Sequence, residues 1–91
     1  MIKRAEITYS GNVQGVGFRF AARNIAGMFH EISGYVENMS DGSVSVVCEG
    51  EQKTVERFIV AIELEMAGYI RDVKVLWSDP TGEFNGFKIR H

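Results

Sequence analysis

The sequence is poor in the residues from which covalent cross-links and metal sites are built. Its single cysteine, Cys48, excludes an internal disulfide bond and favours a reducing compartment. The two histidines, His30 and His91, have no partner at the spacing that a zinc site requires. Aspartate and glutamate residues are scattered, and no pair of them indicates an acid–base dyad. We therefore expect neither a metal nor another cofactor.

Long apolar segments and a strong net charge are lacking as well. No apolar run approaches the roughly 20 residues needed to span a bilayer and no signal peptide begins the sequence, so we expect a cytoplasmic protein without membrane contacts. A net charge of −2 does not favour binding to nucleic acid. The length fits one domain, residues 1–91, which we expect to act as a monomer.

Hydrophobic periodicity predicts both strands and helices. Residues that alternate between apolar and polar indicate strands over 2–10, 32–38, 44–48 and 70–77, and a short last one around 87–89. Spacings of three and four residues indicate helices over 18–29 and about 51–66. Gly27 is expected inside the first helix, and Gly50 is expected to end the third strand. The order predicts an α+β fold, the ferredoxin-like β-α-β-β-α-β sandwich. We expect a mostly antiparallel sheet, two helices on one face and a short fifth strand.

This topology brings distant residues together. A right-handed strand–helix–strand crossover leaves the first two strands parallel, so their carboxyl ends share one edge of the sheet. The N-terminus of the first helix opens on the same edge. The loop from Gly11 to Gly17 and the residue Asn38 should therefore be neighbours, although more than twenty residues separate them.

The glycine-rich loop has the composition of an anion site. Glycines let backbone N–H groups converge on an anion, and the first turn of a helix adds unpaired donors. Arg19 falls in that first turn, and its planar guanidinium can hold two phosphoryl oxygens at once. Glycines are also common at strand-to-helix turns for geometric reasons alone. Taken alone, the loop is compatible with either explanation.

Other phosphate-binding motifs do not fit the sequence. A Walker loop needs Gly-Lys-Ser/Thr after its glycines, whereas Gly17 is followed by Phe18 and Arg19. A dinucleotide fingerprint needs a third glycine where Phe20 stands. A cysteine phosphatase needs an arginine six residues after its nucleophile, and Thr54 occupies that position relative to Cys48. Because it alternates with two valines, Cys48 is interpreted as a buried structural thiol.

Three segments carry a specific resemblance. The stretch Val13–Arg19, VQGVGFR, matches the signature loop of acylphosphatases without a mismatch. Gly34–Asn38, followed by Asp41–Val44, resembles the second signature of that family, and Gly86–Arg90 is similar to its C-terminal strand. The resemblance extends over essentially the whole chain. It implies a small enzyme that hydrolyses acyl phosphates to a carboxylate and inorganic phosphate, without a metal and without a covalent phosphoenzyme.

The resemblance also implies roles for individual residues. Arg19 stands at the position of the family's phosphate-binding arginine, and Asn38 at the position of its water-orienting asparagine. The implied phosphate-binding segment consists of Gln14, Gly15, Val16, Gly17, Phe18 and Arg19. Inorganic phosphate or sulfate should bind there as product or inhibitor. Glu37 stands where the family often has a basic residue, but strand alternation should point it away from Asn38.

Two other functions remain as alternatives, because ferredoxin-like sandwiches also form binding modules. An RNA-binding module would need aromatic residues in its RNP strands and a basic face, and the sequence offers neither. A non-catalytic domain that senses phosphate or another anion would keep the same loop. Turnover of an aryl acyl phosphate would distinguish the enzyme from both.

Overall fold

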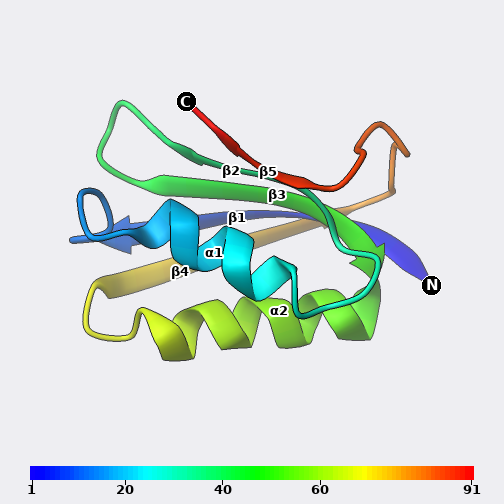
Figure 1. The fold of residues 1–91 in the computed structure, drawn as a ribbon, viewed down its shortest axis with the longest axis horizontal. Coiled ribbons are helices and arrows are strands. Elements are labelled where there is room, and N and C mark those ends of the chain that lie inside the picture. The colour runs from blue at the N-terminus through cyan, green and yellow to red at the C-terminus, as the bar shows by residue number, and fades with distance from the viewer.

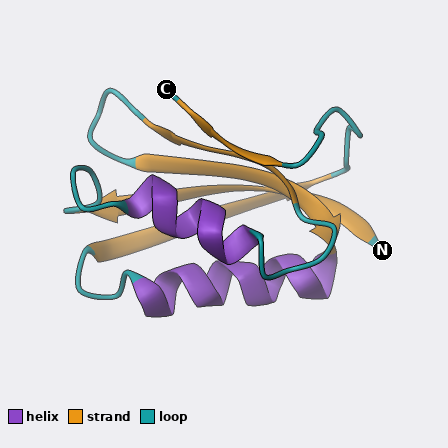
Figure 2. Cartoon of the chain, viewed as in Figure 1, coloured by secondary structure: helices purple, strands orange, loops and turns teal.

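Two helices cover one face of a single sheet in the computed structural model, which describes residues 1–91 (Figure 1). The elements are β1 (Ile2–Gly11), α1 (Phe18–Ala26), β2 (Ser33–Asn38), β3 (Val44–Glu51), α2 (Gln52–Glu65), β4 (Ile70–Ser78) and β5 (Phe87–Arg90). The segments that join them run around the rim of the sheet (Figure 2). Neither helix is long and apolar enough to cross a membrane.

The sheet has five strands in the order β4-β1-β3-β2-β5. β3 returns from the hairpin after β2 and lies between β1 and β2. Because both of these strands are antiparallel to β3, they are parallel to each other, as the crossover argument predicts. β1 pairs with β3 and β4, and β2 pairs with β3, all antiparallel; only β2 and β5 are parallel. This arrangement confirms the ferredoxin-like sandwich with its mostly antiparallel sheet and short fifth strand.

The core lies between the sheet and the two helices. On β1 every second residue faces it, and Ala5, Ile7 and Tyr9 are completely buried. The helices contribute the residues that the three- and four-residue spacing selects, among them Phe58 and Ile62 of α2. Burial of each large apolar side chain contributes roughly 1.5–3 kcal/mol. Because β1 and α1 are both fixed in this core, the loop between them starts and ends at rigid points.

The first helix is shorter than its apolar pattern predicts. α1 ends at Ala26, and Gly27, expected inside the helix, instead caps its C-terminus. The chain then continues in i→i+3 turns, with N–H groups of Met28 and Phe29 donating to carbonyls three residues earlier. Phe29 still packs against Phe58, with ring centroids 6.0 Å apart. The spacing therefore identified a core contact correctly but overestimated the length of the helix.

The third strand is longer than predicted. β3 continues through Gly50 to Glu51, because its last residues pair with the first residues of β1. A Cβ added at Gly50 would lie 3.1 Å from the carbonyl oxygen of Glu31. Glycine therefore serves close packing against the neighbouring segment here and does not end the strand.

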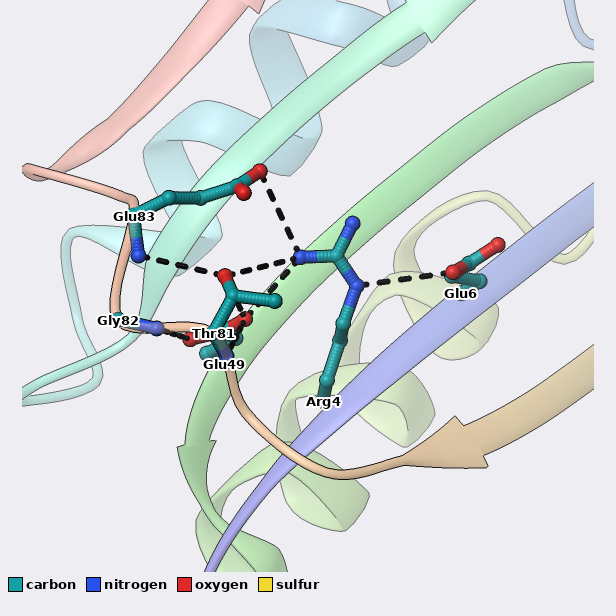
Figure 3. A network of polar contacts seen from close by, with 6 residues as sticks. All are labelled: Arg4, Glu6, Glu49, Thr81, Gly82 and Glu83. Atoms are coloured by element: carbon teal, nitrogen blue, oxygen red, sulfur yellow. Dashed lines mark hydrogen bonds and ion pairs between the residues drawn. The ribbon is translucent and has the colours of Figure 1, made fainter.

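A buried carboxylate secures the connection between β4 and β5 (Figure 3). Glu49, only 5% exposed, accepts hydrogen bonds from the N–H and hydroxyl of Thr81, from the N–H of Gly82 and from the guanidinium of Arg4, at 2.8–3.0 Å. Burial alone would raise the pKa of Glu49, but these hydrogen bonds outweigh it and lower the pKa to about 2. The connection that leads into β5 is thereby tied to the centre of the sheet.

Candidate active site

The predicted neighbours meet in a small pocket of about 90 Å³ at one edge of the sheet. Its lining residues come from the β1–α1 loop, from the first turn of α1 and from the end of β2: Val13, Gly15, Gly17, Phe18, Arg19, Phe20 and Asn38. In Figure 1 the β1–α1 loop, the β2–β3 turn and the C-terminus all lie at the same end of the molecule. The expectation that the glycine loop and Asn38 are close in space is confirmed.

The loop presents a series of backbone donors. Gly15 and Gly17 adopt positive φ angles of 77° and 80°, and Gly17 is the N-cap of α1 without any side-chain cap. The backbone N–H groups from Gln14 to Phe20 donate to no protein acceptor. No acidic residue stands in the first turn of α1. Unpaired donors at the positive end of a helix dipole are suited to holding an anion.

Two buried side chains anchor the loop on either side. Val13 is completely buried and Phe18 is 2% exposed. The Phe18 ring packs against Tyr9 of β1, with centroids 5.1 Å apart. The donors between these anchors are therefore held by the core of the protein rather than by contacts of the loop itself.

Arg19 is half-buried and has a partner that sequence reasoning missed. Its Nη1 lies 3.3 Å from Nδ1 of His91. Since a guanidinium only donates, Nδ1 acts as the acceptor, and the imidazole proton is then on Nε2. The register places Arg90 beside Glu37, so His91 follows at the level of Asn38. The contact between Arg19 and His91 could have been predicted only from the register of β5 on β2.

Asn38 is the last residue of β2 and opens the turn to β3. It pairs with Val44, and the neighbouring Glu37 pairs with Ser45 and Arg90. Asn38 shares the strand face of buried Val36, whereas Glu37 lies on the other face, as alternation predicts. Asn38 thus lines the pocket from the end of a strand, whereas Arg19 lines it from the first turn of α1.

The β2–β3 turn is internally hydrogen-bonded. The N–H of Met39 donates to the Ser43 carbonyl at 2.9 Å, and the N–H of Gly42 donates to the Met39 carbonyl at 3.1 Å. Asp41 accepts from the hydroxyl and the N–H of Ser43 at 2.6 and 2.9 Å, which lowers its pKa. Asx geometry of this kind stabilises the turn that follows Asn38.

Gln14 connects the glycine loop to this turn. Its side-chain Nε2 donates to the carbonyls of Met39, at 2.7 Å, and Ser43, at 2.9 Å. Both amide hydrogens are therefore used within the protein, and only the backbone N–H of Gln14 is left for an anion. Sequence reasoning placed Gln14 among the phosphate-binding residues and did not foresee this contact.

Cys48 is buried in the core, which confirms the interpretation of a structural thiol. Burial raises the pKa of the Cys48 thiol to about 12, so the thiolate required of a nucleophile is not available near neutral pH.

Comparison with known proteins agrees with this geometry. The acylphosphatase family model matches residues 5–89. Over 87 residues the chain is 40% identical to an acylphosphatase of Pelotomaculum thermopropionicum, with 94% of each chain covered. It is 41% identical over 87 residues to an acylphosphatase of a Roseiflexus species, covering 94% of this chain and 92% of the relative.

Solved structures support the same assignment. The crystal structure of an acylphosphatase from Bacillus subtilis superposes with a TM-score of 0.87 at 26% identity, covering 98% of this chain and 99% of that one. The full-length HypF structure in its phosphate- and nucleotide-bound form contains a segment that covers this whole chain at 33% identity and a TM-score of 0.84. That segment is 12% of HypF. With the family model and the curated relatives spanning nearly its full length, the chain belongs to the acylphosphatase family of enzymes.

Proposed function

We propose that the protein hydrolyses acyl phosphates to a carboxylate and inorganic phosphate in the pocket between the glycine loop and Asn38. One observation carries the proposal. Residues of the β1–α1 loop, whose backbone N–H groups have no partner in the protein, line a single small pocket together with Arg19 and Asn38. Each of these groups suits one requirement of phosphoryl transfer, and family membership gives the acyl phosphate as the substrate class.

The loop and Arg19 bind the phosphoryl group. Backbone N–H groups between Gln14 and Phe20 hold its oxygens, and the guanidinium of Arg19 takes two of them in a bidentate contact. Phosphoryl transfer spreads charge over these oxygens, so fixed donors stabilise the transition state without reorganising. Sulfate and the product phosphate are held by the same donors and compete with substrate.

Asn38 orients the attacking water. The water oxygen forms a bond to phosphorus while the bond from phosphorus to the acyl oxygen breaks, and the electron pair leaves with the carboxylate. One water proton passes to an oxygen of the phosphoryl group, so the reaction needs no separate general base. Because a carboxylate is a stable leaving group, little acid catalysis is required. The main contributions of the protein are then position and charge.

We propose that this reaction proceeds without a metal. No group of three or more His, Cys, Asp or Glu side chains is arranged to hold an ion. The positive charge that a metal would supply is provided instead by Arg19 and the N-terminus of α1.

The open face of the sheet argues against an RNA-binding module. Such modules stack bases on aromatic side chains of the two central strands. On the face turned away from the helices, none of the residues of the central strands β1 and β3 is aromatic. They include Arg4, Glu6 and Thr8 of β1 and Ser45, Val47 and Glu49 of β3.

The decisive experiment measures turnover of an aryl acyl phosphate by the purified protein. We expect release of phosphate well above the spontaneous rate, with competitive inhibition by inorganic phosphate. A phosphate-sensing domain would bind phosphate without accelerating hydrolysis, and that result would overturn the proposed function. If phosphate neither binds nor inhibits, the pocket itself is misassigned.

A further inference from the structure

A single side chain joins the two halves of the site. The β1–α1 loop supplies the phosphoryl donors, and the β2–β3 turn begins at Asn38. Residues 12–17 and 39–43 share no backbone hydrogen bond. The only side-chain hydrogen bonds between these segments are the two that Gln14 donates, at 2.7 Å to Met39 and 2.9 Å to Ser43. Apart from the pairing of β1 with β3 in the sheet, one amide group therefore connects the two segments.

The two acceptors lie at the mouth of the turn. The Ser43 carbonyl already accepts the N–H of Met39, so Gln14 binds both strands of the hairpin where they part. Beyond that point Met39, Ser40, Asp41 and Gly42 are all exposed and have no core contact. Without Gln14, the orientation of the turn relative to the loop would depend only on the pairing of β1, β2 and β3.

We propose that Gln14 is a positioning residue, which fixes Asn38 relative to the loop that holds the phosphoryl group. The proposal rests on the proposed function, in which a water on Asn38 must attack phosphorus in line. Misplacement of reacting groups by about 1 Å can cost on the order of 10²-fold in rate. Because Val13 and Phe18 anchor the loop in the core independently, removing the Gln14 contacts should disturb this alignment and leave phosphate binding intact.

The test replaces the amide by a side chain of similar length without donors. In Gln14→Met we expect kcat to fall roughly 10- to 100-fold, with the inhibition constant of phosphate within about threefold of wild type. The only other glutamine, Gln52, lies at the start of α2 and provides the matched control. Gln52→Met should retain its kcat. Unchanged kcat in folded Gln14→Met, or loss of phosphate binding in parallel with kcat, would overturn the positioning role.

A double-mutant cycle tests whether Gln14 acts through Asn38. If it does, Gln14→Met should lower kcat by less than about threefold in a protein that already carries Asn38→Ala, since the aligned group is gone. If the two losses multiply, Gln14 contributes by another route and the proposal is wrong. Melting midpoints of all variants show whether each is folded at the assay temperature.

A measurement without substrate separates this proposal from the proposed function. The N–H groups of Met39 and Gly42 close the turn, and their exchange with water can be followed by NMR. Loss of the Gln14 contacts should speed their exchange by about fivefold in Gln14→Met but not in Gln52→Met. If wild-type protein turns over no acyl phosphate, the proposed function fails, but this comparison still shows whether Gln14 holds the β2–β3 turn in place. Equal exchange in both variants would overturn it.

Discussion

At the scale of single residues, Arg19 should be indispensable for turnover. Replacing it with alanine removes the bidentate contact to a phosphoryl group that gathers charge, which should lower the rate by on the order of 10³-fold. Arg19→Lys should recover little, because an ammonium group cannot reproduce the planar fork. Steady-state rates on an aryl acyl phosphate measure both effects.

Arg23 provides the control for that experiment. It lies one helical turn further along α1, exposed, with its guanidinium 5.2 Å from the centroid of the Phe20 ring. Arg23→Ala removes the same charge from the same helix and should leave kcat near wild type. Equal losses in the two variants would mean that general electrostatics, and not a specific contact, explains the effect of Arg19.

Asn38 should separate chemistry from binding. The attacking water is poorly fixed in the ground state and must be aligned in the transition state, so the Asn38 contact is realised mainly there. Asn38→Ala should lower kcat by about 10²–10³-fold while phosphate inhibits with similar affinity. Asn38→Asp should be no better, because a carboxylate repels the incoming anion. Intact kcat with a lower melting midpoint would reduce Asn38 to a turn residue.

The sequence could predict that Arg19 and Asn38 meet, but not how their surroundings hold them. Their proximity follows from the crossover rule and from the position of each residue at the end of its element. The contacts of Gln14 and of His91 depend on side-chain rotamers and on the register of β5. Neither contact can be predicted from hydrophobic periodicity. A glutamine beside glycines is also not a pattern that indicates a hydrogen bond to a distant turn.

At the scale of elements, the entry to α1 depends on backbone conformation rather than on space. A Cβ added at Gly17 would meet nothing within 4 Å, but the φ of 80° is strained for any L-residue. Gly27, at the other end of α1, has a φ of −66° and also leaves room for a methyl group. These two glycines differ mainly in the sign of φ.

That difference predicts opposite effects of the same substitution. Gly17→Ala should lower the free energy of unfolding by about 1–2 kcal/mol, whereas Gly27→Ala should raise it by about 0.4–1 kcal/mol. Chemical denaturation of both variants provides the measurement. A neutral Gly17→Ala would show that the loop can relax out of the left-handed conformation, and its donors would then not be rigidly held.

Periodicity predicted which side chains face the core more reliably than where elements end. Helix α1 stops at Ala26 although Phe29 continues the apolar spacing, because an i→i+3 turn places that ring almost as a helix would. β3 passes through Gly50 because the paired start of β1 supports it. Both boundaries are decided by neighbouring elements that a local pattern does not contain.

At the scale of the whole molecule, Glu49 should make the stability of the fold depend on pH in the acidic range. Its pKa of about 2 lies below the ordinary value of 4.5. A carboxyl group whose pKa is depressed by folding stabilises the protein fully above about pH 4.5, and this stabilisation is lost as the pH falls towards 2. The melting midpoint of wild type should therefore fall more steeply over this range than that of Glu49→Gln. Parallel curves would contradict the role of the Glu49 network.

Ligand binding should also be visible in the stability of the whole fold. The core holds the proposed phosphate-binding loop in place before an anion binds. An anion that binds only the folded state raises the free energy of unfolding by RT ln(1 + [L]/Kd). At ten times Kd this is about 1.4 kcal/mol, which corresponds to a rise of several degrees in the melting midpoint of a chain of this size. Phosphate should therefore raise the midpoint of wild type, and sodium chloride at equal ionic strength should not. Because the backbone donors alone bind more weakly, Arg19→Ala should show a much smaller rise, and Arg23→Ala should match wild type. A flat response in wild type, or an equal rise in Arg19→Ala, would mean that the anion acts elsewhere on the surface and that the loop is a turn without a binding role.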